Sequence, residues 1–178
     1  MRRLDLVPDC GNCVAICCVV TSFDASPEFA IDKPAGRRCP HLSRSYRCTI
    51  HRERELLGFS GCIAYDCYGA GQKVTRTFAA RPDADGERAE AFLALREIHE
   101  LLWLLTEAEK ICPEPSSGLR IAIAREVETL DRIAAGPMEE LGRVNLPFRR
   151  RAAASLLRRV GALLGDRENG RRMLTVID

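Results

Sequence analysis

Eight of the nine cysteines of this 178-residue chain lie in its first third, between Cys10 and Cys67. The ninth, Cys112, stands alone in the remaining two thirds. A segment so rich in thiols is organised by sulfur chemistry, whether as metal ligands, disulfides or catalytic groups. This clustering therefore constrains the fold more than any other feature of the sequence.

The cellular compartment decides between metal ligands and disulfides. Arg2 and Arg3 imitate the basic start of a signal peptide, but Asp5 and Pro8 interrupt what would be its apolar core. The longest apolar runs also fall far short of the ~20 residues that a membrane span needs. We therefore expect a cytoplasmic protein without a membrane span. In a reducing compartment, clustered thiols are more often metal ligands than disulfides.

The first cysteine block reads Cys10-Gly-Asn-Cys13-Val-Ala-Ile-Cys17-Cys18. In a continuous helix, Cys10 and Cys17 would lie about 10 Å apart along the axis, too far for one ion. Either Gly11 and Asn12 form a loop that folds the first two cysteines back, or the block serves a polynuclear cluster or two separate sites. Adjacent cysteines point in different directions, so Cys17 and Cys18 fit poorly into one tetrahedral site.

Further candidate ligands follow in Cys39-Pro-His41, in Cys48-Thr-Ile-His51 and in the pair Cys62 and Cys67. The two-residue spacing between Cys48 and His51 lets a turn bring both side chains onto one metal. Such a soft ligand set favours zinc or an iron-sulfur cluster over magnesium or calcium. The predicted ligands are Cys10, Cys13, Cys17, Cys18, Cys39, Cys48, Cys62 and Cys67, with His51 as a further candidate.

These linked cysteine blocks, together with Cys39-Pro-x-Leu42 and Cys48-x-Ile-His51, resemble the CxxCxxCC or YkgJ-type cysteine-cluster family, described as zinc- or iron-chelating. A closer resemblance is to the N-terminal region of actinobacterial pentapeptide-repeat proteins. It is carried by Phe29-Ala-Ile-Asp-Lys33, Gly58-Phe-x-Gly-Cys62-x2-Tyr-Asp-Cys67 and Gly69-Ala-Gly-Gln72. The resemblance implies a metal-binding segment followed by helices. No pentapeptide repeat occurs in this sequence, so it implies no repeat helix.

The rest of the chain has helical periodicity. Tyr68-Gly-Ala-Gly-Gln72 predicts a turn after the last clustered cysteine. Apolar residues then recur at helical spacing in three long stretches. They are Phe92, Leu95, Ile98, Leu102 and Leu105; then Leu119, Ile123, Val127, Leu130 and Ile133; then Leu156, Leu157, Val160, Leu163 and Leu164.

Caps and breakers separate these stretches. Asp83 or Asp85 can begin the first, Cys112-Pro-Glu-Pro115 ends it, and Ser116 or Ser117 can cap the second. Gly136-Pro137 stops the second, and a shorter piece around 138–144 leads to Asn145, which can cap the last, with Pro147 in its first turn. The predicted fold is mainly α: a small irregular cysteine-rich metal-binding module (1–75), a linker (76–86) and an antiparallel helical bundle with a basic C-terminal end (87–178).

Three functions fit this organisation. In the first, the cysteines hold zinc or an iron-sulfur cluster that folds the N-terminal segment, and the chain acts as a structural or interaction module for a protein partner. In the second, the metal belongs to an enzyme or enzyme component with a site between the cysteine module and the helices. In the third, Cys10 and Cys13 form a thiol redox pair, although no thioredoxin-like βαβ pattern surrounds them. The first is favoured, and whether the chain is an enzyme stays open.

The C-terminal end is basic, which could attract nucleic acid or an acidic partner. No aromatic residues interleave with its arginines, so a solvated face is the favoured interpretation and nucleic-acid binding is not. The arginines are Arg149, Arg150, Arg151, Arg158, Arg159, Arg167, Arg171 and Arg172.

Overall fold

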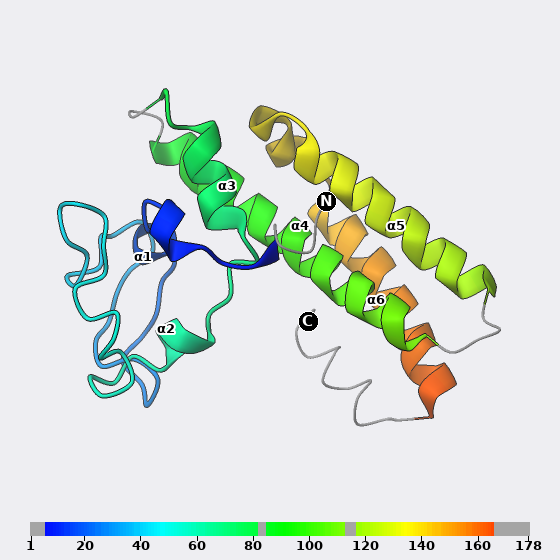
Figure 1. Ribbon diagram of the computed structural model, residues 1–178, viewed down its shortest axis with the longest axis horizontal. Helices are drawn as coiled ribbons and strands as arrows, with labels where there is room; N and C mark the ends of the chain where they lie inside the picture. Colours follow the sequence, from blue (N-terminus) through cyan, green and yellow to red (C-terminus); the bar gives the residue numbers. More distant parts are fainter. Residues whose placement is uncertain (1–5, 82–84, 113–116, 166–178) are drawn as a thin grey trace. The chain divides into compact units, whose positions relative to one another are not determined.

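The computed structural model describes residues 6–81, 85–112 and 117–165 and is mainly helical, which confirms the predicted fold class at this level (Figure 1). The elements are the 3-10 helix η2 (Cys10–Asn12), α1 (Cys17–Val20), α2 (Gly61–Ala64), α3 (Ala70–Thr77), α4 (Asp85–Ile111), α5 (Ser117–Ala135), the 3-10 helix η3 (Met138–Arg143) and α6 (Leu146–Leu164).

The chain divides into two compact units. The first contains the described residues up to Phe92, and the second contains those from Leu93 onward. The division therefore falls inside α4. The predicted linker at 76–86 lies before it: α3 extends to Thr77, and 82–84 are outside the described residues. The predicted domain boundaries stay a prediction.

The periodicity of the longest helix is confirmed. In α4 the five predicted apolar positions are all buried, and Asp85 and Glu87 lie in the first turn. Acidic side chains are favourable there because the helix dipole is positive at its N-terminus. Lys110 lies in the last turn, where the dipole favours a cation. Of the two proposed capping residues, Asp83 is outside the described residues.

The start of α6 follows from two residues. The Asn145 side chain accepts a hydrogen bond from the amide of Phe148 at 3.0 Å, and Pro147 stands in the first turn. Both were predicted, since Asn satisfies an otherwise unpaired helical N–H and Pro has no N–H to satisfy. Gly165 ends the helix with a φ of 65°, a conformation that glycine adopts without strain.

The second unit is held together by apolar faces and two ion pairs. Helices α5 and α6 contact each other, and Arg149 of α6 pairs with Glu126 of α5 at 3.3 Å. Arg150 pairs with Glu97 of α4 at 3.1 Å. Two of the arginines assigned to a basic C-terminal end are therefore engaged within the unit. Arg167, Arg171 and Arg172 lie outside the described residues.

The cysteine-rich segment, Cys10–Cys67, consists of turns, loops and single β-bridges rather than long elements. Bridges join Phe23 to Lys33 and Leu42 to Cys48. The turn predicted at Tyr68–Gln72 is wrong beyond its first residues, because α3 begins directly after Gly69. Gly69 has a φ of 77°, so it turns the chain sharply, and the residues after it continue as a helix.

Among the described residues, no helix combines the length and the apolar composition that crossing a membrane requires.

Candidate metal centre

The first two cysteines belong to a tight loop. The Asp9 side chain accepts hydrogen bonds from the backbone and the side-chain amide of Asn12 at 3.2 and 2.7 Å, which closes the single turn of η2. Cys13 then continues in an extended conformation. The chain therefore takes the loop path at Gly11 and Asn12 that the sequence left as one alternative.

Arg47 holds this loop from outside. Its guanidinium donates hydrogen bonds to the carbonyl oxygens of Cys10 at 3.4 Å, Gly11 at 2.8 Å and Cys13 at 3.0 Å. Arg47 is also the residue before Cys48, so it ties the Cys10–Cys13 loop to the strand-like stretch that carries the sixth cysteine. Sequence reasoning missed this role, since one more arginine in a basic chain gives no signal.

Helix α3 backs the loop. Gln72, which is buried, donates to the carbonyl of Val7 at 2.8 Å and accepts from the amide of Asp9 at 3.2 Å. A Cβ on Gly71 would lie 2.8 Å from Sγ of Cys13 and 3.7 Å from Sγ of Cys67. The two thiols therefore lie over the same point of α3, and only glycine leaves room for them.

Four thiols form a first neighbourhood. Partial desolvation raises the pKa of Cys10, and the nearby Cys67 and Cys13 raise it further. Burial likewise raises the pKa of Cys67, with Cys13 among its neighbours. Cys13 and Cys67 also raise the pKa of Cys17. We call this set the first thiol group: Cys10, Cys13, Cys17 and Cys67.

The remaining four form a second neighbourhood. Burial raises the pKa of Cys62 to about 11, and Cys18, Cys39 and Cys48 add to the shift. Burial also raises the pKa of Cys39, next to Cys18 and Cys48. The backbone brings these residues together, since the amide of Cys39 donates to the carbonyl of Cys18 at 2.9 Å. We call this set the second thiol group: Cys18, Cys39, Cys48 and Cys62.

The two groups meet at Cys17 and Cys18, whose side chains are hydrogen-bonded to each other. That bond lowers the pKa of Cys18 to about 7, because it stabilises the Cys18 thiolate, and it raises the pKa of Cys17, which donates. Cys18 also raises the pKa of Cys10, although its effect is smaller than those of Cys67 and Cys13. The groups are thus adjacent neighbourhoods rather than distant ones.

Two cations accompany the thiols. The ammonium of Lys33, only 3% exposed, donates to the carbonyl oxygens of Val19 at 3.0 Å and Pro34 at 3.3 Å and to that of Thr21. Burial lowers its pKa, and the neighbouring thiols of Cys39 and Cys18 oppose that shift. Arg54 donates to the carbonyl of Cys62 at 3.1 Å. Both cations lower the pKa of Cys18.

The thiols are neighbours without being drawn together around one point. Within the parts of the chain that the structure describes, no three side chains of His, Cys, Asp or Glu lie close enough together to hold a metal ion. All nine cysteines are free thiols. The side chain of His51 is exposed, and His41 packs edge-on against Phe59 with ring centroids 5.1 Å apart. Cys112 is buried in the second unit.

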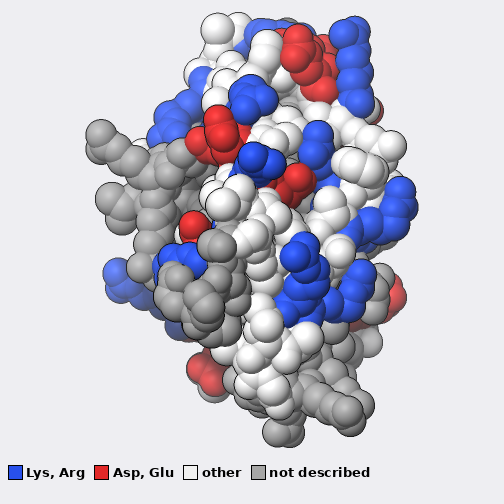
Figure 2. All heavy atoms as spheres, turned by 90° about the vertical axis from the view of Figure 1, so that its right-hand side faces the viewer, with Lys and Arg blue, Asp and Glu red and all other residues white. Residues whose placement is uncertain are grey.

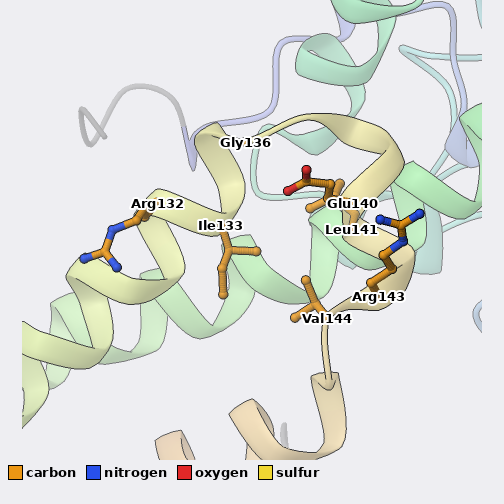
Figure 3. A pocket seen from close by; sticks show the side chains of 7 residues that line it. All are labelled: Arg132, Ile133, Gly136, Glu140, Leu141, Arg143 and Val144. Atoms are coloured by element: carbon orange, nitrogen blue, oxygen red, sulfur yellow. The ribbon is translucent and has the colours of Figure 1, made fainter.

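The second unit has a separate open pocket of about 510 Å³ on the last turns of α5 and on η3 (Figure 3). Its lining combines apolar and charged side chains without a cysteine or histidine: Arg132, Ile133, Gly136, Glu140, Leu141, Arg143 and Val144. On the face shown in Figure 2, basic side chains are interspersed with acidic and uncharged ones.

The chain is similar to the uncharacterized protein YybG of Bacillus subtilis (strain 168). The two are 35% identical over 147 residues, which cover 79% of this chain and 49% of YybG. The chain thus spans about half the length of the curated relative that it matches. No family model matches the chain, and no solved structure matches it significantly. The resemblance to the cysteine-cluster family stays a prediction.

Proposed function

We propose that this chain is a metal-binding protein whose clustered cysteines hold zinc or an iron-sulfur cluster, in a structural or interaction role for a protein partner. The observation that carries the proposal is the gathering of eight thiols from a stretch of the chain with few other means of folding. The finer architecture belongs to the same proposal: a cysteine-rich metal-binding module followed by an antiparallel helical bundle.

The chemistry of the donors supports this function. Thiolates are the ligands that zinc and iron-sulfur clusters prefer. A metal-thiolate centre carries negative charge, and the buried Lys33 and the nearby Arg54 are placed to offset it. Without such a centre, the buried ammonium of Lys33 has the carbonyl oxygens, the ring of Phe23 and the nearby Cys18 thiol to offset its charge, which is less compensation than an anionic centre gives.

The energetics of the segment support a structural metal. Of the described residues before Tyr68, only Leu6, Ile16, Leu42 and Phe59 are buried apolar side chains. Three non-glycine residues of the segment and its edge, Ala15, Tyr46 and Tyr68, also have positive φ angles of 52°, 57° and 47°. Such conformations are costly and persist only where other interactions impose them. Metal binding free energy is available for this purpose, because it becomes folding free energy.

Enzymatic and redox roles remain alternatives. An enzyme needs an open coordination position beside a cavity. The described pocket lies on α5 and η3 and has no cysteine or histidine in its lining. A redox pair at Cys10 and Cys13 is disfavoured by the environment of Cys10. Partial desolvation raises the pKa of the Cys10 thiol, which leaves less of the nucleophilic thiolate.

The test is metal content with an absorption spectrum on full-length protein purified without oxygen. Colourless protein with bound zinc supports a structural centre, and brown protein with iron and acid-labile sulfide supports a cluster.

Replacing Cys13 or Cys18 by Ser should lower metal content and disorder the cysteine-rich segment while most helical circular dichroism remains. Cys112→Ala is the matched control, since it removes a thiol from the second unit. Protein that folds fully and binds neither metal would refute the proposal.

A further inference from the structure

We infer that the exposed face of α6 is a docking surface for an acidic helix of a protein partner, whose carboxylates pair with Arg151, Arg158 and Arg159. This inference rests on the proposed interaction role and deepens it, because it locates the binding surface and states the charge of the partner. It concerns the helical unit, so it does not depend on which metal the cysteines hold.

Helix α6 carries positive charge without acidic residues of its own to offset it. Its 19 residues include five arginines and neither Asp nor Glu. Two of the arginines are engaged within the helical unit, Arg149 by Glu126 at 3.3 Å and Arg150 by Glu97 at 3.1 Å. The other three are exposed and make no ion pair within the described parts of the chain. They are Arg151, Arg158 and Arg159.

These three arginines share one face of the helix. Counted from Arg151, the exposed residues Ser155, Arg158, Arg159 and Ala162 follow at helical spacing and form a stripe about 100° wide. Arg151 and Arg159 are about 12 Å apart along the helix axis at 1.5 Å per residue. The opposite face of α6 is buried in the helical unit. The stripe is therefore a surface that the fold of the unit leaves open.

The neighbouring helix α5 does not neutralise this stripe. It contacts α6 but has no acidic residue before Glu126, and Glu126 is already paired with Arg149. The part of α5 before Glu126 instead adds Arg120 and Arg125 to the positive charge of the unit. Like charges gathered on one surface repel each other and oppose the compact state. A helix with this pattern is stabilised when an anionic partner covers it.

Carboxylates on helices are the anions that α6 already binds. Arg149 and Arg150 each pair with a glutamate of an adjacent helix, and a partner helix laid along the exposed stripe would repeat that contact from outside. The planar guanidinium group fits a carboxylate with two parallel hydrogen bonds. Glutamates at positions i, i+4 and i+7 of a helix lie on one face, with the same spacing as the arginine stripe.

Nucleic acid fits the stripe less well than an acidic helix does. Proteins that bind duplex DNA typically neutralise about six to ten phosphates, and three arginines within about 12 Å reach far fewer. No aromatic residue lies between Arg151 and Arg159 on which an unpaired base could stack. The formal net charge of the chain is also only +2, so long-range attraction to a polyanion is weak.

The test titrates the full-length, metal-loaded chain with a short alanine-based helical peptide that has glutamates at positions i, i+4 and i+7. Nitrogen-15 NMR at low ionic strength follows the Nε–Hε signals of the arginines. The signals of Arg151, Arg158 and Arg159 should shift. A peptide with glutamine in place of glutamate should bind about tenfold more weakly or less, because an exposed ion pair contributes a factor of about two to five and three are lost. Equal binding of the two peptides would overturn the proposal.

Variants separate the stripe from net charge. Replacing Arg151, Arg158 and Arg159 together by Gln should weaken the glutamate peptide by about tenfold or more, with helical circular dichroism unchanged. The matched control removes the same charge from three exposed arginines elsewhere and should bind as the unchanged chain does. Its changes are Arg37→Gln, Arg44→Gln and Arg125→Gln. The same loss in both variants would contradict a specific surface.

Two further outcomes are decisive. A DNA duplex that binds through the same arginines more tightly than the glutamate peptide would replace the acidic helix by nucleic acid as the partner and so overturn the proposal. Metal content, measured on the same samples, separates this test from that of the metal centre. Metal-loaded protein that ignores the peptide refutes the docking surface alone, whereas metal-free protein that binds the peptide supports the surface and counts against the metal centre.

Discussion

Twenty apolar side chains are buried between Leu93 and Gly165, and four are buried between Leu6 and Tyr68, counted over the described residues of each stretch. Burying a leucine- or phenylalanine-sized side chain stabilises a fold by about 1.5–3 kcal/mol. The helical unit can therefore fold on its own apolar faces. The cysteine-rich segment, of similar length, buries far fewer apolar side chains, and it carries eight thiols, the buried Lys33 and the half-buried Arg54.

The difference shows that one short chain can use two separate sources of stability. The helices exclude water from a core, a source that needs no ligand. The cysteine-rich segment depends on polar contacts to backbone carbonyls from Lys33, Arg47 and Arg54, which orient loops but bury little apolar area. A ligand that binds only the folded segment would supply the missing free energy.

Metal removal should separate the two units most sharply. Treating the metal-loaded chain with a strong chelator should expose most amides between Cys10 and Cys67, because structural zinc contributes about 10 kcal/mol or more to small metal-folded units. The amides in the middle of α5 and α6 should stay protected. Hydrogen exchange followed by mass spectrometry measures both. Equal loss of protection in both units would show that they do not fold independently.

A cavity in the helical core should have the converse effect. Leu105, which is fully buried in α4, should on replacement by Ala lower the free energy of unfolding of the helical unit by about 2–5 kcal/mol. Metal content should not change. Leu93→Ala is the control, because Leu93 lies on the same helix with 51% of its surface exposed. Chemical denaturation followed by helical circular dichroism gives the values, and a Leu93→Ala effect as large as that of Leu105→Ala would argue against this core.

Removing the buried ammonium should act on the cysteine-rich segment alone. Lys33→Met leaves the carbonyls of Val19, Thr21 and Pro34 without their donor, which should cost about 1–3 kcal/mol. It should also weaken metal retention in competition with a chelator. Arg37→Met removes an exposed positive charge from the same loop and should change neither quantity measurably. Matching behaviour of the two variants would mean that Lys33 contributes only net charge.

The smallest expected effect is at a helix cap. Asn145→Ala removes the acceptor for the Phe148 amide and should destabilise α6 by about 1 kcal/mol. Asn145→Asp keeps the acceptor and should cost much less. Thermal unfolding of the two variants, compared at equal metal content, measures the difference. A loss of metal in Asn145→Ala would instead indicate coupling between the units.

Sequence reasoning predicted the helical unit well and the cysteine-rich segment poorly. The three long helices follow from apolar periodicity and local capping, as at Asn145, because these signals act within a few residues. Helix α3 was missed because its eight residues, Ala70–Thr77, offer no apolar repeat long enough to detect. The arrangement of the thiols depends on contacts between residues far apart in sequence, such as Gly71 with Cys13, which no local pattern encodes.

The positions of two thiols along the chain have a consequence for how the segment tolerates insertions. Cys13 and Cys67 are roughly fifty residues apart in the sequence, yet the Sγ atoms of both lie beside Gly71. A metal ion bound by both thiols would close that whole loop, and the entropic cost of closing a loop rises by only about 0.6 kcal/mol for each doubling of its length. Residues inserted into the loops between the two cysteines would therefore cost the proposed centre little.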